Sequence, residues 1–72
     1  MILSQSKQGK YIVTTLPTGR NIEHKLNVMG IRLESIIEVL INKNYYPMVI
    51  KVGKTTLSIG RGMASRIEVN PL

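Results

Sequence analysis

Few side chains in this sequence have the chemistry of a catalytic group. The chain contains one histidine, His24, no cysteine, and four acidic residues that are all glutamates. Enzymatic chemistry needs a nucleophile beside a base, a pair of carboxylates or a bound metal. The glutamates are spread singly along the chain, and no serine stands in the context of a nucleophile elbow. We therefore expect that the protein is not an enzyme and has no catalytic residues.

The same scarcity argues against a metal centre or a cofactor site. Without cysteine, thiolate ligands, thiol redox chemistry and disulfides are excluded. His24 has no second histidine or cysteine nearby, so we expect an exposed side chain on a helix rather than a ligand. We expect no resident metal and no cofactor.

One glycine pair could suggest phosphate binding. Gly60 and Gly62 flank Arg61, but this stretch lacks the length and the Lys-Ser/Thr ending of a P-loop. We interpret it as a backbone turn. The octet Leu57–Ala64 around it is then the point where the strands end, one helical turn forms and the sheet closes.

The charge calls for a partner hypothesis. The formal net charge is +6, and basic surfaces attract nucleic acids, anionic membranes or acidic proteins. The ten Lys and Arg residues are scattered singly, and three tyrosines are the only aromatic residues. Single-strand binders usually interleave aromatic with basic residues, so the pattern argues against nucleic acid. A small basic barrel that binds RNA or DNA remains the alternative hypothesis.

No segment predicts a membrane or secreted protein. No apolar run approaches the roughly 18 residues of a membrane span, and the first residues lack the apolar core of a secretory signal. We expect a cytoplasmic protein without membrane insertion, either a monomer or a weak homo-oligomer.

The chain of 72 residues allows one domain, residues 1–72, and its patterning is mainly β. One helix is predicted at Arg20–Met29, because Ile22, Leu26 and Met29 share a face and Gly30 suits a C-terminal cap. Alternating or β-branched runs predict five strands, at Lys10–Leu16, Ser35–Ile41, Met48–Val52, Thr55–Ile59 and Arg66–Val69.

The turns predict how these strands connect. Gly53-Lys54 between two alternating runs indicates a two-residue type II′ hairpin. Met63–Ser65 is long enough for one helical turn before the last strand, and Asn70–Leu72 should trail off. Ile2 and Leu3 should pack against the sheet. Five short strands fit a small, curved barrel, because closure removes exposed edges.

Binding residues are expected on the loops. Tyr45 and Tyr46 belong to the loop predicted at Asn42–Tyr46 between two strands, and tyrosine is enriched at interfaces. The alternative is that one ring covers the mouth of the barrel. Met63 fits the core better than a contact, whereas Arg32, Arg61 and Arg66 fit a solvated surface. Arg61 could also meet an acidic partner. The candidate partner-binding residues are Tyr45, Tyr46, Arg32, Arg61 and Met63.

Four segments of the chain resemble the FeoA family of ferrous-iron transport proteins. They are Leu26–Ile31 (LNVMGI), Ile36–Leu40 (IIEVL), Pro47–Val52 (PMVIKV) and Leu57–Ala64 (LSIGRGMA). Their order and spacing match the family over about residues 9–69. The block from Ile59 to Ala64, with Ile67–Val69 behind it, is the most specific part.

The resemblance implies an SH3-like barrel with one short helix between its first two strands. FeoA-like proteins are small, cytoplasmic and bacterial, and are thought to assist FeoB, a membrane transporter with a GTP-binding domain that moves Fe(II) inward. Similar domains stand at the C-terminus of DtxR-type metal-dependent repressors. The family has no established catalytic residues. We thus expect an accessory protein that binds and modulates an FeoB-type transporter. The scarcity of His, Cys and Asp argues against a direct Fe(II) carrier.

One position departs from the family pattern. The family usually has Pro-Gly after Gly30-Ile31-Arg32, where this chain has Leu33-Glu34. Glycine there would suit a positive φ angle, which glutamate resists. Either the turn type differs, or the loop follows a path on which every φ is negative.

Overall fold

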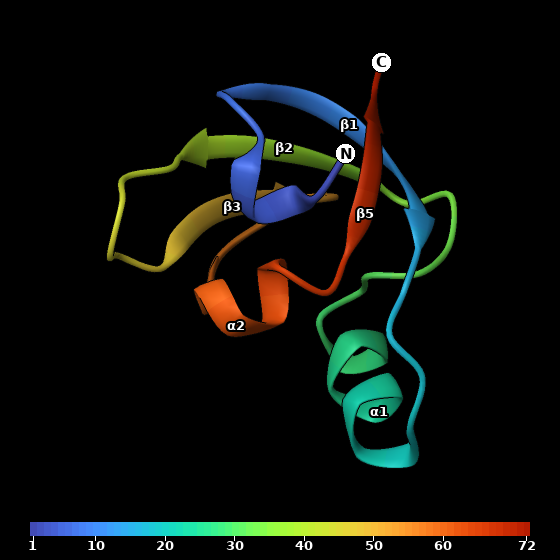
Figure 1. The fold of residues 1–72 in the computed structure, drawn as a ribbon. Coiled ribbons are helices and arrows are strands. Elements are labelled where there is room, and N and C mark those ends of the chain that lie inside the picture. The colour runs from blue at the N-terminus through green and yellow to red at the C-terminus, as the bar shows by residue number, and fades with distance from the viewer.

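The computed structural model describes residues 1–72 and is mainly β, with five strands and three short helical segments (Figure 1). The strands are β1 (Gly9–Thr15), β2 (Ile36–Ile41), β3 (Met48–Val52), β4 (Thr55–Ile59) and β5 (Glu68–Pro71). The helices are η1 (Leu3–Gln5), which is a 3₁₀ turn, α1 (Arg20–Val28) and α2 (Arg61–Ala64). The mainly β prediction, with a helix after the first strand and a helical turn before the last, is confirmed.

The strands form one antiparallel sheet in the order β4-β3-β2-β1-β5. The sheet is strongly curled, and the chain has the SH3-like fold that the resemblance implied (Figure 1). β4 and β5 are its two ends and are not hydrogen-bonded to each other, so the sheet is open rather than closed. Short η1 and α2 supply Leu3 and Ala64 to the core.

The core is aliphatic, as the absence of Phe and Trp requires. Alternation places Ile37 and Val39 of β2 and Met48 and Ile50 of β3 in it, all fully buried. The register between β2 and β3 shifts after Val39, which is the signature of a β-bulge. Ile41, which strict alternation would place on the same face as Ile37 and Val39, is therefore 48% exposed.

The last strand lies further along the chain than predicted. β5 covers Glu68–Pro71 instead of residues 66–69, and Leu72 donates its N–H to Lys10 O at 3.1 Å. The expectation that residues 70–72 trail off is wrong, because they pair with β1. Proline is tolerated at Pro71 because β5 is an end strand of the sheet.

Helix α1 ends in the way its sequence predicts. Gly30 has a φ of 82°, its N–H donates to Asn27 O, and the N–H of Ile31 donates to Leu26 O. These two bonds define a Schellman motif, which also brings together two apolar side chains. Leu26 and Ile31 are both buried and attach α1, which projects at one end of the molecule, to the core (Figure 1).

In the turn after α1, a residue other than glycine adopts a left-handed backbone conformation. Ser35 donates its N–H to Arg32 O at 3.0 Å, and Glu34 has a φ of 69°. A positive φ at the third residue of such a turn defines type II, for which Pro-Gly is the preferred central pair. The interpretation with only negative φ angles is therefore wrong, and Glu34 adopts the conformation that suits glycine.

The hairpin between β3 and β4 also matches its prediction. Gly53 has a φ of 61°, whereas Lys54 is not among the residues with positive φ. A positive φ at only the first central residue is the mark of a type II′ turn. The turn leaves the pairing of β3 with β4 in unbroken register.

Candidate functional site

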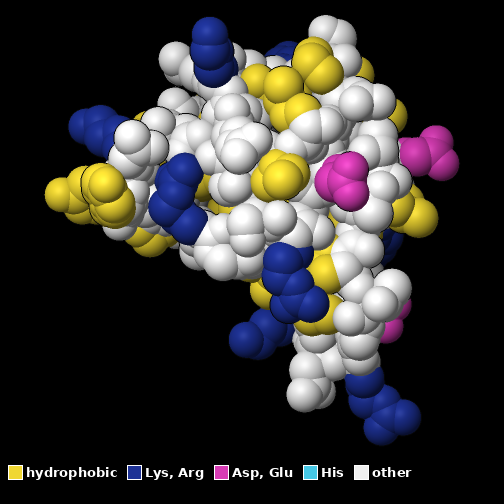
Figure 2. All heavy atoms as spheres, in the orientation of Figure 1, with side chains coloured by type: hydrophobic (Ala, Val, Ile, Leu, Met, Phe, Trp, Pro, Cys, Tyr) yellow, Lys and Arg dark blue, Asp and Glu magenta, His cyan; other side chains and the backbone are white.

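The most exposed aromatic surface lies on the loop between β2 and β3, residues 42–47, which we call the tyrosine loop. Tyr45 is 96% exposed and Tyr46 is 65% exposed. The backbone of Tyr45 is left-handed, with a φ of 70°. Neither ring is buried, so the alternative in which one ring covers the mouth of the barrel is not what the structure shows. The loop projects at the left of Figure 1, where Figure 2 shows a protruding group of hydrophobic atoms.

A single arginine holds this loop in place. The guanidinium of Arg61 donates from Nη1 to Asn42 Oδ1 at 2.8 Å, to Lys43 O at 3.0 Å and to Tyr46 O at 3.1 Å. Its Nη2 donates to Ser4 O at 2.9 Å. Arg61 is thus half-buried and engaged, not part of the solvated surface that the sequence suggested. It links α2 to the tyrosine loop and to the N-terminal segment.

Asn42 extends this link. Its side-chain amide donates to Ser4 O at 3.1 Å and to Ser6 O at 2.8 Å, while its oxygen accepts from Arg61. The base of the loop is therefore fixed by polar contacts from two directions. The tyrosines extend from a rigid base, which lowers the entropic cost of using them in a contact.

An apolar groove of about 380 Å³ adjoins the tyrosine loop. Its lining residues come from the end of β2, the loop, β3 and β4: Ile41, Lys43, Tyr46, Pro47, Val49 and Ser58. The β-bulge that exposes Ile41 thus contributes to this surface. An exposed apolar groove beside aromatic side chains is a suitable contact for another protein.

The other candidate residues do not join this surface. Arg32 is exposed near α1, and its Nε donates to Asn27 Oδ1 at 3.0 Å. Met63 is partly buried and packs against the core, in agreement with the sequence interpretation. Arg66 is exposed.

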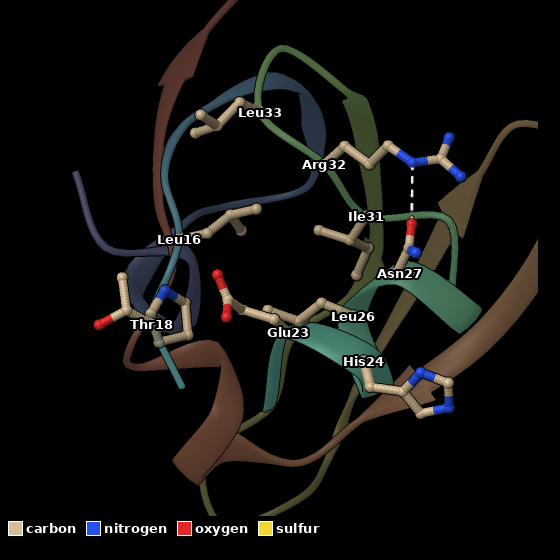
Figure 3. Close-up of a pocket in the computed structure, with 10 residues that line it drawn as sticks. Leu16, Thr18, Glu23, His24, Leu26, Asn27, Ile31, Arg32 and Leu33 are labelled. Carbon is tan, nitrogen blue, oxygen red and sulfur yellow. Dashed lines mark hydrogen bonds between the residues drawn. The ribbon is translucent and has the colours of Figure 1, made fainter. Parts of the chain in front are cut away.

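A second groove, which the sequence reasoning missed, lies between α1 and the end of β1 (Figure 3). It encloses about 410 Å³, and Leu16, Leu26, Ile31 and Leu33 supply its apolar lining. Glu23 extends its carboxylate into the hollow, whereas the imidazole of His24 points away from it (Figure 3). Leu33 is 60% exposed. The one feature of the sequence that could have indicated this groove is Leu33, an apolar residue in a turn.

The charges are unevenly distributed along the chain. No acidic residue occurs between Glu38 and Glu68, a stretch that holds half of the cations: Lys43, Lys51, Lys54, Arg61 and Arg66. On the face in Figure 2 the basic side chains stand apart from one another. The excess of basic residues in this stretch favours a partner of negative charge.

The structure gathers no group of three or more His, Cys, Asp or Glu side chains that could hold a metal ion. Neither α1 nor any other helix has the length and apolar character that crossing a bilayer requires. The arrangement offers apolar grooves, exposed tyrosines and basic charge, which are the elements of a binding surface.

Comparison with known proteins places the chain in a family. The crystal structure of an iron uptake regulatory protein (FeoA) is similar over 100% of this chain and 97% of its own, with a TM-score of 0.93 and 36% sequence identity. The solution structure of iron(II) transport protein A from Clostridium thermocellum has a TM-score of 0.90 and 26% identity. It is similar over the whole of this chain and 46% of its own.

A further solved structure, that of ScaR, shares the fold at lower identity. ScaR, whose crystal structure contains Cd²⁺, is similar over all of this chain with a TM-score of 0.92 and 18% identity, which shows the fold alone. This chain spans 35% of that structure. A comparison with functionally curated proteins finds no match. The FeoA domain family matches residues 1–71, and the chain therefore belongs to the FeoA family.

Proposed function

We propose that this protein is a non-enzymatic accessory protein of ferrous-iron uptake in the cytoplasm, where it binds and modulates an FeoB-type GTP-dependent membrane transporter. Membership of the FeoA family supports a role in ferrous iron transport. The observation that carries the proposal is the family match over residues 1–71.

The surface supports binding as the mode of action. The tyrosine loop presents two exposed rings on a base that Arg61 holds rigid. Tyrosine combines a large apolar area with a hydroxyl and loses little conformational freedom on binding. The basic charge adds attraction to an acidic partner surface and raises the rate of encounter.

The test is direct binding of the full chain to the isolated cytoplasmic part of the ferrous-iron transporter from the same cell. It is run with GDP and with a GTP analogue, at low and at moderate salt, by titration calorimetry. We expect saturable binding that persists at moderate salt, and a nucleotide preference would identify the state that is recognised.

Variants locate the contact. Tyr45→Ala and Tyr46→Ala should each weaken binding by about tenfold, because truncation of a tyrosine at an interface often costs more than 1 kcal/mol. Val28→Ala is the control, since Val28 is 73% exposed, between the two tyrosines in exposure, but lies on α1. Unchanged affinity of both tyrosine variants would exclude the loop as the contact. Absence of binding under every condition would contradict the proposed function.

A further inference from the structure

The two ends of the open sheet differ in how their edges are covered. The edge of β5 is protected by the N-terminal segment, through an isolated bridge between Ile2 and Glu68. Leu3 donates its N–H to Ile67 O at 2.8 Å, and Val69 donates to Met1 O at 2.7 Å. With the N-terminal amine of Met1, which donates to Val69 O at 3.0 Å, the outward backbone groups of Ile67 and Val69 are bonded within the chain.

The edge of β4 has no such cover. No hydrogen bond outside the ladder with β3, from backbone or side chain, involves residues 55–59. Thr55, Thr56 and Ser58 are exposed. Native proteins usually protect a free edge with charge, proline, a bulge or a covering segment. β4 has none of these, because its sequence is TTLSI and its register with β3 is unbroken.

The hairpin determines which backbone groups face outward. In a two-residue hairpin the flanking residues, here Val52 and Thr55, form a hydrogen-bonded pair, and such pairs alternate along the ladder. Ile50 then bonds with Leu57, and Thr56 and Ser58 direct their N–H and C=O groups to the free edge. These groups are arranged to bond with an added strand.

Charge indicates what kind of strand would fit. On the outer face, the register aligns Lys10, Glu38, Lys51 and Thr56 in one row across four strands. Glu38 lies between two lysines, which leaves an excess of positive charge next to β4. Lys54 in the hairpin and Lys43 by the groove add to it, and no acidic residue occurs between Glu38 and Glu68. A second copy of this basic surface would be repelled.

We propose that the free edge of β4 accepts an extended acidic segment of a partner protein by strand addition. The inference rests on the proposed function and identifies the kind of segment through which the transporter would be bound. Main-chain bonds to Thr56 and Ser58 would supply part of the affinity, and the side chains of the added strand would supply specificity.

The geometry defines the pattern of that segment. Neighbouring strands lie about 4.8 Å apart, so an added strand lies about 10 Å from β3, which a lysine and a carboxylate side chain together span. The outward residue next to Thr56 is therefore acidic, facing Lys51. The outward residue next to Ser58 is apolar, because it continues the row of Ile41 and Val49 at the groove.

The first experiment removes the outward donor. Ser58→Pro deletes an N–H that the fold itself does not use, and proline is tolerated at such edge positions. Ser58→Ala is the matched control, because it changes the side chain but keeps the N–H. We expect Ser58→Pro to weaken binding to the cytoplasmic part of the transporter by about tenfold or more, and Ser58→Ala to bind like the wild type. Lys51→Gln should weaken binding and reduce its salt dependence.

The second experiment does not depend on a folded proline variant. Amide hydrogen exchange of the wild-type protein is followed by NMR, free and in complex with the same transporter part. We expect the amides of Thr56 and Ser58 to exchange fast in the free protein and slowly in the complex.

The outcomes separate this inference from the proposed function. Binding with no protection of these amides and no effect of Ser58→Pro would overturn the edge contact alone. No binding at all would overturn both. Protection that appears in the free protein at high concentration and disappears on dilution would identify a second copy as the occupant, and tighter binding to single-stranded DNA than to the transporter would identify a nucleic acid. Either result would overturn the proposal that an acidic segment binds at the edge of β4.

Discussion

Replacing Glu34 with glycine should stabilise the protein. Glu34 is exposed and left-handed, at a φ of 69°, in the type II turn that joins α1 to β2. A residue with a Cβ atom in this conformation costs about 1–2 kcal/mol. Glycine removes that cost, but its greater conformational freedom in the unfolded chain lowers the free energy of unfolding by about 0.4–1 kcal/mol. The net gain is therefore on the order of 0–1.6 kcal/mol, and its midpoint of about 0.8 kcal/mol corresponds to a rise in melting temperature of roughly 3–6 °C for a domain of this size.

The assay is urea and thermal unfolding of the wild type, Glu34→Gly and Glu34→Ala, followed by circular dichroism. The alanine variant removes the charge and the long side chain but keeps the Cβ atom, so it should remain within about 0.5 kcal/mol of the wild type. The turn is anchored in all three, because the N–H of Glu34 donates to Val13 O at 2.8 Å. If Glu34→Gly is no more stable than Glu34→Ala, the left-handed backbone of residue 34 does not lower the stability of the protein.

Two further substitutions test the packing and the polar link. Arg61→Ala should destabilise the fold by about 2–4 kcal/mol in urea unfolding, because it removes four hydrogen bonds from a charged donor. Arg66→Ala is the exposed control and should change the stability little. Equal effects of the two substitutions would refute the structural role of Arg61. Leu26→Ala should cost about 2–5 kcal/mol, since Leu26 is the one buried side chain of α1; retention of full stability would show that α1 does not depend on this anchor.

Local patterns in the sequence predicted most of the elements. The alternation in β3 and β4, the Gly53-Lys54 turn and the Gly30 cap each depend on residues within a few positions of one another, so single-sequence reasoning could identify them. The packing of Leu3 was also expected, and it is fully buried.

Features that depend on distant residues were not predicted. The register of β5 is determined by its pairing with β1, where Tyr11 faces Pro71, and no local pattern encodes that choice. The exposed Ile41 depends on a bulge between β2 and β3. The expected closure of the barrel would have required β4 to pair with β5, whereas the N-terminal segment bonds to the edge of β5 instead.

The candidate site was predicted in its residue types more than in its arrangement. Exposure of Tyr45 and Tyr46 follows from their polar, asparagine-containing loop. Arg61 could not be assigned from sequence, because its acceptors include Ser4, which is distant in the chain. A surface role and a structural role are indistinguishable for an arginine until its partners in space are known.

The polar link of Arg61 and the free edge of β4 belong to one end of the molecule. α2 begins directly after β4, and Arg61 at its start fixes the tyrosine loop, so the loop and the edge are held by the same short segment. Ser58 of the edge and Tyr46 of the loop also line the same groove. A strand added at β4 would therefore pass beside Tyr46. The Ile59–Ala64 block, which is the most specific part of the resemblance, thus contains the arginine that holds the tyrosine loop in place.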